Sequence, residues 1–217
     1  GSLAGVLGQC LLLATLDLHS NGIGAAGARR LAGVLGQCSS LAELDLYYND
    51  MGDEGATSLA GVLGQCSALS KLDLASNDMR ADGAGMLAGV MGQCSALATL
   101  DLGHNGIRDE GVGRLARVLG QCMVLAELCL GGNSIGAEGA GSLAGVLGQW
   151  PLLTTLNLAG DVFGDPFREG NLIGAEGARS LAGVLGQCSS LATLDLRDNG
   201  IEDEGARSLA QRLVQCS

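Results

Sequence analysis

The sequence predicts an α/β solenoid, in which short strands and helices alternate and stack along one direction. Near-identical segments return every 28 residues, each with a leucine alternation of period two followed by apolar residues at helical spacing. The spacing is marked by cysteines and one tryptophan: Cys10, Cys38, Cys66, Cys94, Cys122, Trp150, Cys188 and Cys216. Only the step from Trp150 to Cys188 is longer, at 38 residues, so the seven repeats contain one insertion of 10 residues.

The second repeat, residues 41–68, shows how each unit begins. Its first part, "LAELDL", alternates at Leu44 and Leu46, which predicts a short strand with one buried face. Asn49 follows and starts a turn. An Asn side chain both donates and accepts hydrogen bonds, so we expect the asparagine of each repeat to satisfy loop backbone groups of neighbouring repeats.

The second part of the repeat predicts a helix. Asp53 and Glu54 place negative charge where it is favourable beside a helix N-terminus. Gly64 lies near the expected end, where glycine suits a C-cap. Between them an apolar stripe runs at i, i+3, i+4 and i+7, formed by Ala56, Leu59, Ala60 and Leu63.

Stacking such units forces curvature. Neighbouring strands lie about 4.8 Å apart, whereas helix axes need roughly 8–10 Å. We therefore expect the strands to line an inner, concave wall and the helices to lie outside. A unit of this kind cannot bury its apolar faces alone and must stack on its neighbours.

The pattern "LxxLxLxxN" resembles that of leucine-rich repeat proteins of the ribonuclease-inhibitor-like subclass. That subclass includes the repeat regions of NOD-like receptors and Ran GTPase-activating proteins. The resemblance implies one right-handed α/β horseshoe over residues 1–217, which recognises macromolecules, mostly proteins, and is rarely an enzyme. The pattern occurs at residues 13–21, 41–49, 69–77, 97–105, 125–133 and 191–199, and in interrupted form at 153–160 plus Asn171.

Composition excludes several classes of function. The formal net charge of −11, with 12 Lys and Arg in total, argues against nucleic acid, whose phosphates repel such a surface. No run of 18 or more apolar residues occurs, so we expect no membrane span, and the N-terminus lacks the pattern of a secretory signal. The resemblance, rather than the composition, implies a protein partner.

The eight cysteines favour reduced thiols over disulfides or zinc. There is no C-x-x-C, and equivalent positions at helix spacing exceed the roughly 7 Å Cα limit for a bridge. Buried free thiols suit a reducing, cytoplasmic compartment. Cys129 takes the place of a concave aspartate, so we expect it to point outward and to react fastest with alkylating reagents.

Motifs for catalysis, cofactors or metals are weak. "GIGAAG" at 22–27 fits a dinucleotide fingerprint, but its glycines are the periodic turn glycines of the repeat. His19 and His104 lie three strand spacings apart, roughly 14 Å, and cannot share one metal ion directly. We therefore expect no catalytic residue, no cofactor and no metal ligand.

The candidate binding residues lie on the expected concave wall. Asp17, Asp45, Asp73 and Asp101 occupy the outward position between the strand leucines of four successive repeats. One interpretation is structural, with each carboxylate hydrogen-bonded locally or solvated. The other is that the strip attracts a basic partner surface, where electrostatics governs on-rate and orientation more than affinity.

Two further elements stand beyond the strands. Tyr47 and Tyr48 are the only tyrosines and are expected on the concave rim as paired anchors. The insertion near 161–170 leaves the end of the sixth strand and contains Phe163, Phe167 and Arg168. Its phenylalanines either form a binding loop or fold back on the fifth and sixth repeats, and the sequence favours neither.

The favoured function is a non-catalytic protein-recognition scaffold that uses the concave face and the inserted loop. The alternatives are a regulator of a partner enzyme, such as a GTPase-activating or inhibitory module, and a consensus-designed repeat scaffold. The near-identical "LAGVLGQC" units agree with recent duplication or with design. Because the end repeats would expose apolar faces and strand edges, we also expect self-association through the ends.

Overall fold

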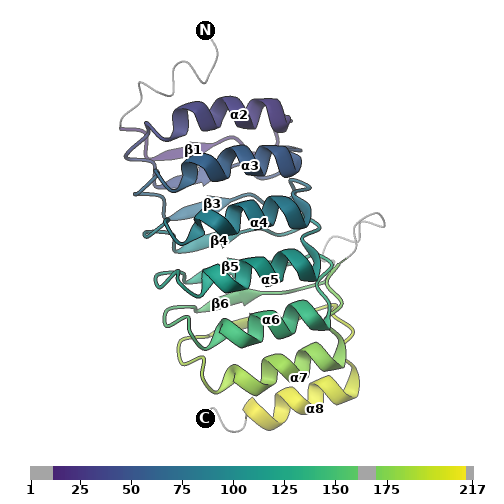
Figure 1. The fold of residues 1–217 in the computed structure, drawn as a ribbon. Coiled ribbons are helices and arrows are strands. Elements are labelled where there is room, and N and C mark those ends of the chain that lie inside the picture. Colours follow the sequence, from purple (N-terminus) through teal and green to yellow (C-terminus); the bar gives the residue numbers. More distant parts are fainter. Residues whose placement is uncertain (1–11, 161–169, 214–217) are drawn as a thin grey trace.

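The computed structural model describes residues 12–160 and 170–213, which build one parallel sheet backed by a row of helices (Figure 1). The predicted α/β solenoid is confirmed. Its seven strands follow in sequence order and are β1 Thr15–Asp17, β2 Glu43–Asp45, β3 Lys71–Asp73, β4 Thr99–Asp101, β5 Glu127–Cys129, β6 Thr155–Asn157 and β7 Thr193–Asp195. The described helices are α2 Gly24–Leu35, α3 Gly52–Leu63, α4 Arg80–Met91, α5 Arg108–Leu119, α6 Ala137–Leu147, α7 Gly174–Leu185 and α8 Glu202–Leu213.

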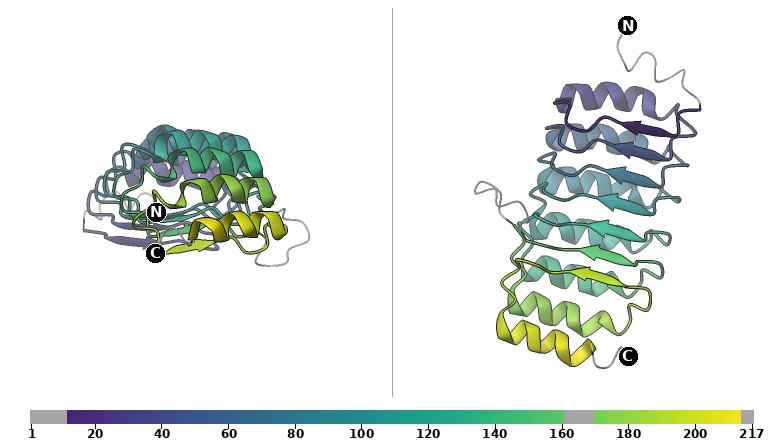
Figure 2. Two further views of the ribbon diagram at one scale, coloured as in Figure 1. Left: turned by 90° about the horizontal axis from the view of Figure 1, so that it is seen from below. Right: turned by 180° about the vertical axis from the view of Figure 1, so that it is seen from behind.

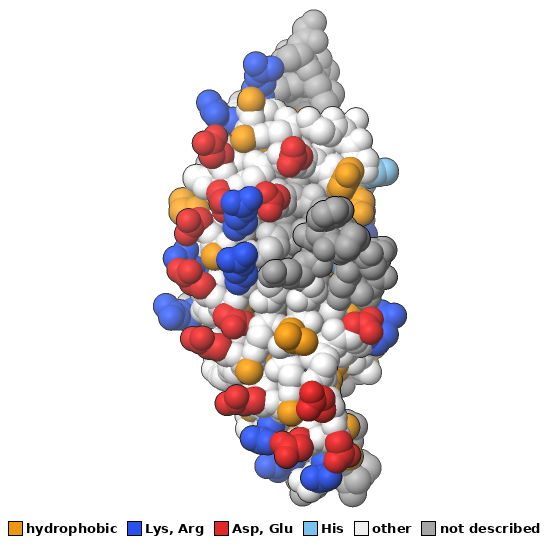
Figure 3. Space-filling model, turned by 90° about the vertical axis from the view of Figure 1, so that its right-hand side faces the viewer, with side chains coloured by type: hydrophobic (Ala, Val, Ile, Leu, Met, Phe, Trp, Pro, Cys, Tyr) orange, Lys and Arg blue, Asp and Glu red, His pale blue; other side chains and the backbone are white. Residues whose placement is uncertain are grey.

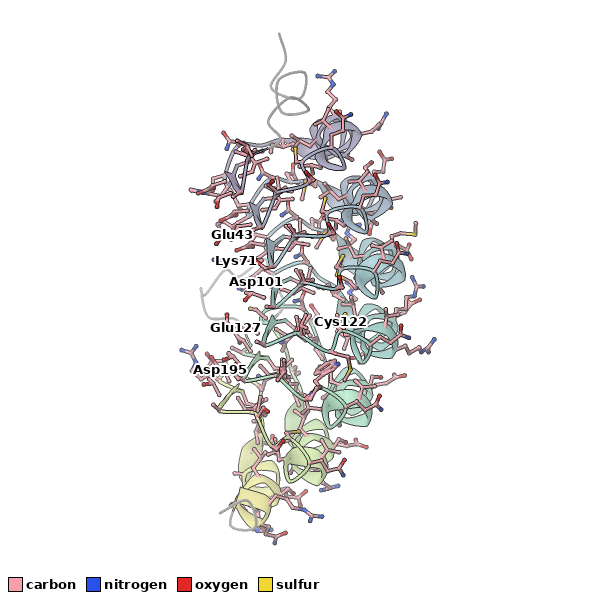
Figure 4. The ribbon with its side chains drawn as sticks, turned by 90° about the vertical axis from the view of Figure 1, so that its left-hand side faces the viewer. Glu43, Lys71, Asp101, Cys122, Glu127 and Asp195 are labelled. Atoms are coloured by element: carbon pink, nitrogen blue, oxygen red, sulfur yellow. The ribbon has the colours of Figure 1, made fainter. Side chains whose placement is uncertain are left out.

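The sheet and the helices form two layers. Figure 2 shows the strands on one face of the described stack and the helices on the other. Seen along the sheet edge in Figure 4, the row of helices bends around the strands, so the sheet lies on the inner side of the curve. This is the curvature expected from the different spacings of strands and helices.

The register of the sheet repeats from strand to strand. Leu16 pairs with Leu44, and Leu44 with Leu72, so the central leucine of each strand lies beside its equivalent in the next repeat. Leu156 and Leu194 are also paired, although 38 residues separate them. The insertion therefore leaves the strand register unchanged.

The core lies between the two layers and consists mostly of leucine and alanine. The strand leucines Leu44, Leu72, Leu100 and Leu128 are 0–1% exposed, and the helix leucines Leu59 and Leu115 pack into the same cluster at 0%. The periodicity of two in the strands and 3.6 in the helices thus aims both sets at one interior. Burial of this apolar surface is the main term that holds the repeats together.

The repeated asparagines link each repeat to the one before it. The buried Asn105 side chain donates from Nδ2 to the carbonyl oxygens of Leu102 at 3.0 Å and of Leu74, in the preceding repeat, at 2.9 Å. Its Oδ1 accepts the backbone N–H of Asn77 at 2.9 Å. The same bonds recur in an asparagine ladder formed by Asn49, Asn77, Asn105, Asn133, Asn171 and Asn199, so the expected structural role is confirmed.

The periodic cysteines make a second link between repeats. The Sγ atoms of Cys66 and Cys94 lie 3.7 Å from the carbonyl oxygens of Leu35 and Leu63, one repeat earlier. Trp150 takes the cysteine position in its repeat and donates its Nε1–H to the Leu119 carbonyl at 2.6 Å. The described cysteines are free thiols, and four of them are buried: Cys38, Cys66, Cys94 and Cys122.

Gly64 is the C-cap residue of α3, as the sequence predicts, and its N–H bonds the Val62 carbonyl. Its φ of −62° is right-handed, so the cap does not use the left-handed conformation that glycine often provides there. A Cβ at Gly64 would lie 2.5 Å from Oε1 of Gln93 in the next repeat, so a larger residue would require that flexible side chain to shift.

We predict that Asn105→Ala destabilises the protein by several kcal/mol. The change leaves the buried N–H groups of Asn77 and Met79 without their acceptor, at about 1–3 kcal/mol for each group. It also removes one of the two donors to the Leu74 and Leu102 carbonyls. Urea denaturation followed by circular dichroism measures the loss. Asn21→Ala is the matched control, because Asn21 is exposed and, among the described residues, its Nδ2 bonds only carbonyls of its own turn. Equal losses for both variants would contradict the role of the ladder.

Candidate recognition surface

Two columns of side chains point from the sheet away from the helices, and together they form the concave wall. The first column is the first residue of each strand: Thr15, Glu43, Lys71, Thr99, Glu127, Thr155 and Thr193. The second is the third residue: Asp17, Asp45, Asp73, Asp101, Cys129, Asn157 and Asp195. Figure 4 shows the labelled members Glu43, Lys71, Asp101, Glu127 and Asp195 on the side opposite to the helices.

The sequence prediction identified the second column and missed the first. The strand alternation that identifies the second column could also have revealed the first, because residues two apart in a strand share a face. Glu43 and Glu127 add carboxylates to the wall, and Lys71, the single lysine of the chain, places a positive charge between them. The wall is therefore acidic, with one cation in its N-terminal half.

The aspartates of the second column are bonded to their own turns. Asp101 accepts the backbone N–H of Gly103 at 2.8 Å, and Asp45 accepts that of Tyr47 at 2.9 Å. The same bond occurs at Asp17, Asp73, Asn157 and Asp195. This agrees with the structural interpretation of the column, while a binding role for Asp17, Asp45, Asp73 and Asp101 stays a prediction.

The middle of the column is less favourable for negative charge than its ends. Burial, together with the charges of Asp101 and Asp45, raises the pKa of Asp73 to about 6, although the Ala75 N–H bond opposes this. At the ends, hydrogen bonds from His19 lower the pKa of Asp17, and hydrogen bonds from Arg197 lower that of Asp195. Repulsion between carboxylates is thus relieved at both ends and retained in the centre.

Cys129 occupies the outward position that the sequence predicts, between Asp101 and Asn157 in the sheet register. It is half-buried, as is Cys188. Burial, with the nearby Asp101 charge, raises the pKa of the Cys129 thiol to about 12. Since the thiolate is the reactive form, the raised pKa slows alkylation of Cys129 at neutral pH. Burial also raises the pKa of Cys66, Cys94 and Cys122, so the expectation that Cys129 reacts fastest stays a prediction.

The tyrosine pair lies at the end of β2 and is exposed as expected. Tyr47 is 37% and Tyr48 57% exposed, and their ring centroids are 6.0 Å apart. The backbone beneath them is fixed, because the Tyr47 carbonyl accepts the Ser20 N–H at 2.8 Å and the Tyr48 N–H bonds the Ala75 carbonyl. Figure 3 shows the edge where the strands end, and there hydrophobic side chains are few and lie among charged ones.

The insertion begins at the same edge. Gly160 and Asn171, which flank it, both bond to the stack: Gly160 N–H donates to the Arg197 carbonyl at 2.7 Å, and Asn171 Oδ1 accepts the Asn133 N–H at 2.8 Å. The asparagine ladder therefore continues past the insertion. Phe163, Phe167 and Arg168 lie outside the described residues, so their role stays a prediction. Leu172, just beyond, is 70% exposed.

Among the described residues, no helix is long and apolar enough to cross a membrane.

Comparison with known families assigns the class of protein. Six segments match the family model described as Leucine Rich repeat, at residues 9–32, 37–60, 65–88, 93–116, 121–144 and 187–210. The chain belongs to the leucine-rich repeat family. The unmatched segment between 144 and 187 contains Trp150 and the insertion, which are the two departures from the repeat pattern.

Two solved structures share the fold. One is described as leiomodin-1 actin-binding site 2, with a TM-score of 0.53, 14% identity, and coverage of 75% of this chain and 90% of that one. The other is the tropomodulin C-terminal domain of Caenorhabditis elegans, with a TM-score of 0.52, 12% identity and 99% coverage of both chains. At these identities the likeness shows the fold alone. Comparison with curated protein sequences finds no significant match.

We predict that Asp73→Asn raises stability near pH 7 and has little effect near pH 4. A carboxyl whose folded pKa lies above its ordinary 3.8 favours the folded state when protonated, so the wild-type protein loses this contribution as the pH rises from about 4 to about 6. Asparagine removes the charge and keeps the acceptor for Ala75. Urea denaturation at both pH values measures the difference, with Asp50→Asn, outside the wall, as control. Equal effects of Asp73→Asn at pH 4 and pH 7 would contradict this electrostatic account.

Proposed function

We propose that this protein is a non-catalytic recognition scaffold that binds a protein partner with a basic surface. The concave wall and the tyrosine pair form the contact surface. The observation that carries the proposal is the position of two exposed aromatic rings, Tyr47 and Tyr48, directly beside a column of carboxylates. Neither feature is needed to hold the repeats together, since leucines and asparagines do that.

The charge of the wall suits association with a basic partner. Asp45, Asp73 and Asp101 lie on adjacent strands in register, and Glu43 and Glu127 extend the negative field across the sheet. A partner cation between these groups would relieve the repulsion that, together with burial as the larger cause, raises the pKa of Asp73. Such a field mainly accelerates encounter and sets orientation, and salt screens it.

The tyrosine pair supplies apolar contact at low entropic cost. Its backbone is already ordered by bonds to the first and third repeats, so binding would fix only side-chain rotamers. Tyrosine combines a large apolar surface with a polar end and is enriched at sites that dominate binding energy. We therefore assign the direct contacts that dominate binding energy to Tyr47 and Tyr48, and the long-range electrostatic attraction to the wall.

The experiment compares the proteins that immobilised variants capture from one cell extract, identified by mass spectrometry. We expect Tyr47→Ala with Tyr48→Ala, and Asp45→Asn with Asp101→Asn, to lose the same captured proteins. The matched control is Glu54→Gln with Glu138→Gln, on the exposed helix side. Capture that is equal for all variants would overturn the assignment of the surface. Because the leiomodin-1 structure is described as an actin-binding site, actin cosedimentation serves as a defined probe in the same series.

The inserted loop is tested separately by excising residues 161–170. The excision joins Gly160 to Asn171, as Gly132 precedes Asn133, so we expect stability to be retained. We propose that the loop extends the recognition surface, so that excision or Phe163→Ala with Phe167→Ala weakens capture. A large fall in melting temperature after excision would instead give the loop a structural role.

A further inference from the structure

The concave wall has one place where a histidine lies against two carboxylates. One ligand atom from each of Asp17, His19 and Asp45 lies within 4.8 Å of the others. This is the one group of three potential metal ligands among the described residues. The sequence does not reveal it, because the two histidines are too far apart to share an ion and the third ligand, Asp45, comes from an adjacent strand.

The fold positions these groups from two repeats. Asp17 and Asp45 end β1 and β2 and are paired in register. His19 follows Asp17 by two residues, and its Nδ1 lies 2.7 Å from Asp17 Oδ1. The same position in the later repeats is held by other residues: Tyr47, Ala75, Gly103, Gly131, Ala159 and Arg197.

The electrostatic environment favours a cation at this point. Asp17 Oδ1 lies 2.7 Å from His19 Nδ1, and Asp45 is the register partner of Asp17, so two carboxylates lie beside one imidazole. At the other end of the column Arg197, the equivalent of His19, neutralises Asp195 directly through bonds of 2.6 to 3.1 Å, so this position takes a permanent cation in the last repeat.

We propose that Asp17, His19 and Asp45 form a divalent transition-metal site, with zinc as the best-matched ion. An imidazole nitrogen with two carboxylate oxygens is a typical zinc donor set, whereas magnesium and calcium prefer oxygen ligands. Zinc bonds of about 2.0–2.1 Å place ligand atoms roughly 3.3 Å apart. The ligand atoms of the three side chains lie within 4.8 Å of one another, and because Asp17 and His19 are exposed, water can complete the coordination.

A bound ion would join the first two repeats and change the recognition surface. It would cross-link the ends of β1 and β2 and neutralise the wall next to Tyr47, whose N–H bonds the ligand Asp45. An ion that binds only the folded arrangement stabilises it by mass action. The site is thus distinct from general attraction of cations to the acidic wall, which needs no histidine and no particular strand.

Calorimetric titration of the full chain with zinc chloride at pH 7.5 tests the proposal, after accessible thiols are blocked with N-ethylmaleimide. We expect one equivalent of zinc to bind, and His19→Ala and Asp45→Asn each to weaken binding at least 10-fold. The matched controls are His104→Ala, the other histidine, and Asp101→Asn, a wall carboxylate outside the site; both should bind as the wild type does. Excess magnesium chloride should not displace the zinc.

A second readout is the pair of histidine ring signals in nuclear magnetic resonance spectra. Zinc should shift the ring signals of His19 and leave those of His104 unchanged. The proposal is overturned if the wild type binds no zinc, if His19→Ala binds as tightly as the wild type, or if magnesium competes on equal terms, which would indicate nonspecific attraction to the acidic wall.

Discussion

A buried amide that recurs once per repeat is the constraint on which the rest of the structure depends. Each ladder asparagine satisfies carbonyls of its own turn and of the preceding repeat, and accepts an N–H from that repeat. Leucine burial supplies most of the stabilising free energy, but it is not directional. The ladder bonds are directional, and they fix the turn that follows every strand. The two rim residues that precede each ladder asparagine therefore have an ordered backbone.

This constraint divides the residues of each repeat into those that contact neighbouring repeats and those that do not. Leucine, asparagine and the periodic cysteine or tryptophan are committed to contacts between repeats, whereas the outward strand positions and the two residues before each asparagine are not. The chain varies at those uncommitted positions, from Tyr47 and Tyr48 to glycines at 131 and 132. The aspartates of the second column belong to the second group: each accepts an N–H of its own turn with one oxygen and adds charge to the wall. Chemistry that distinguishes this protein from other stacks of the same fold accordingly lies on the wall and rim.

Periodicity was sufficient to predict the strands, the helices, the register and the role of the asparagines, because all of them repeat within one chain. Features that arise between repeats were not predictable in this way. The raised pKa of Asp73 comes first from burial and then from carboxylates of two flanking strands, and the space around Gly64 is limited by Gln93 of the next repeat. The approach of Asp45 to His19 likewise requires the register of β1 and β2. Sequence placed Cys129 correctly but could not show how far neighbouring side chains bury its thiol.

The most direct test of the ladder is native-state amide hydrogen exchange measured residue by residue. The backbone N–H groups of Asn49, Asn77, Asn105 and Asn133 bond the next asparagine in the ladder. They should exchange as slowly as amides in the middle of α4 and α5, through opening of the whole stack. The N–H of Asn21 makes the same bond, to Asn49 Oδ1 at 3.0 Å, but Asn21 is exposed, so local opening should let it exchange faster. Exchange of the four internal asparagine amides at the rate of the exposed rim would contradict the claim that the ladder holds the repeats together.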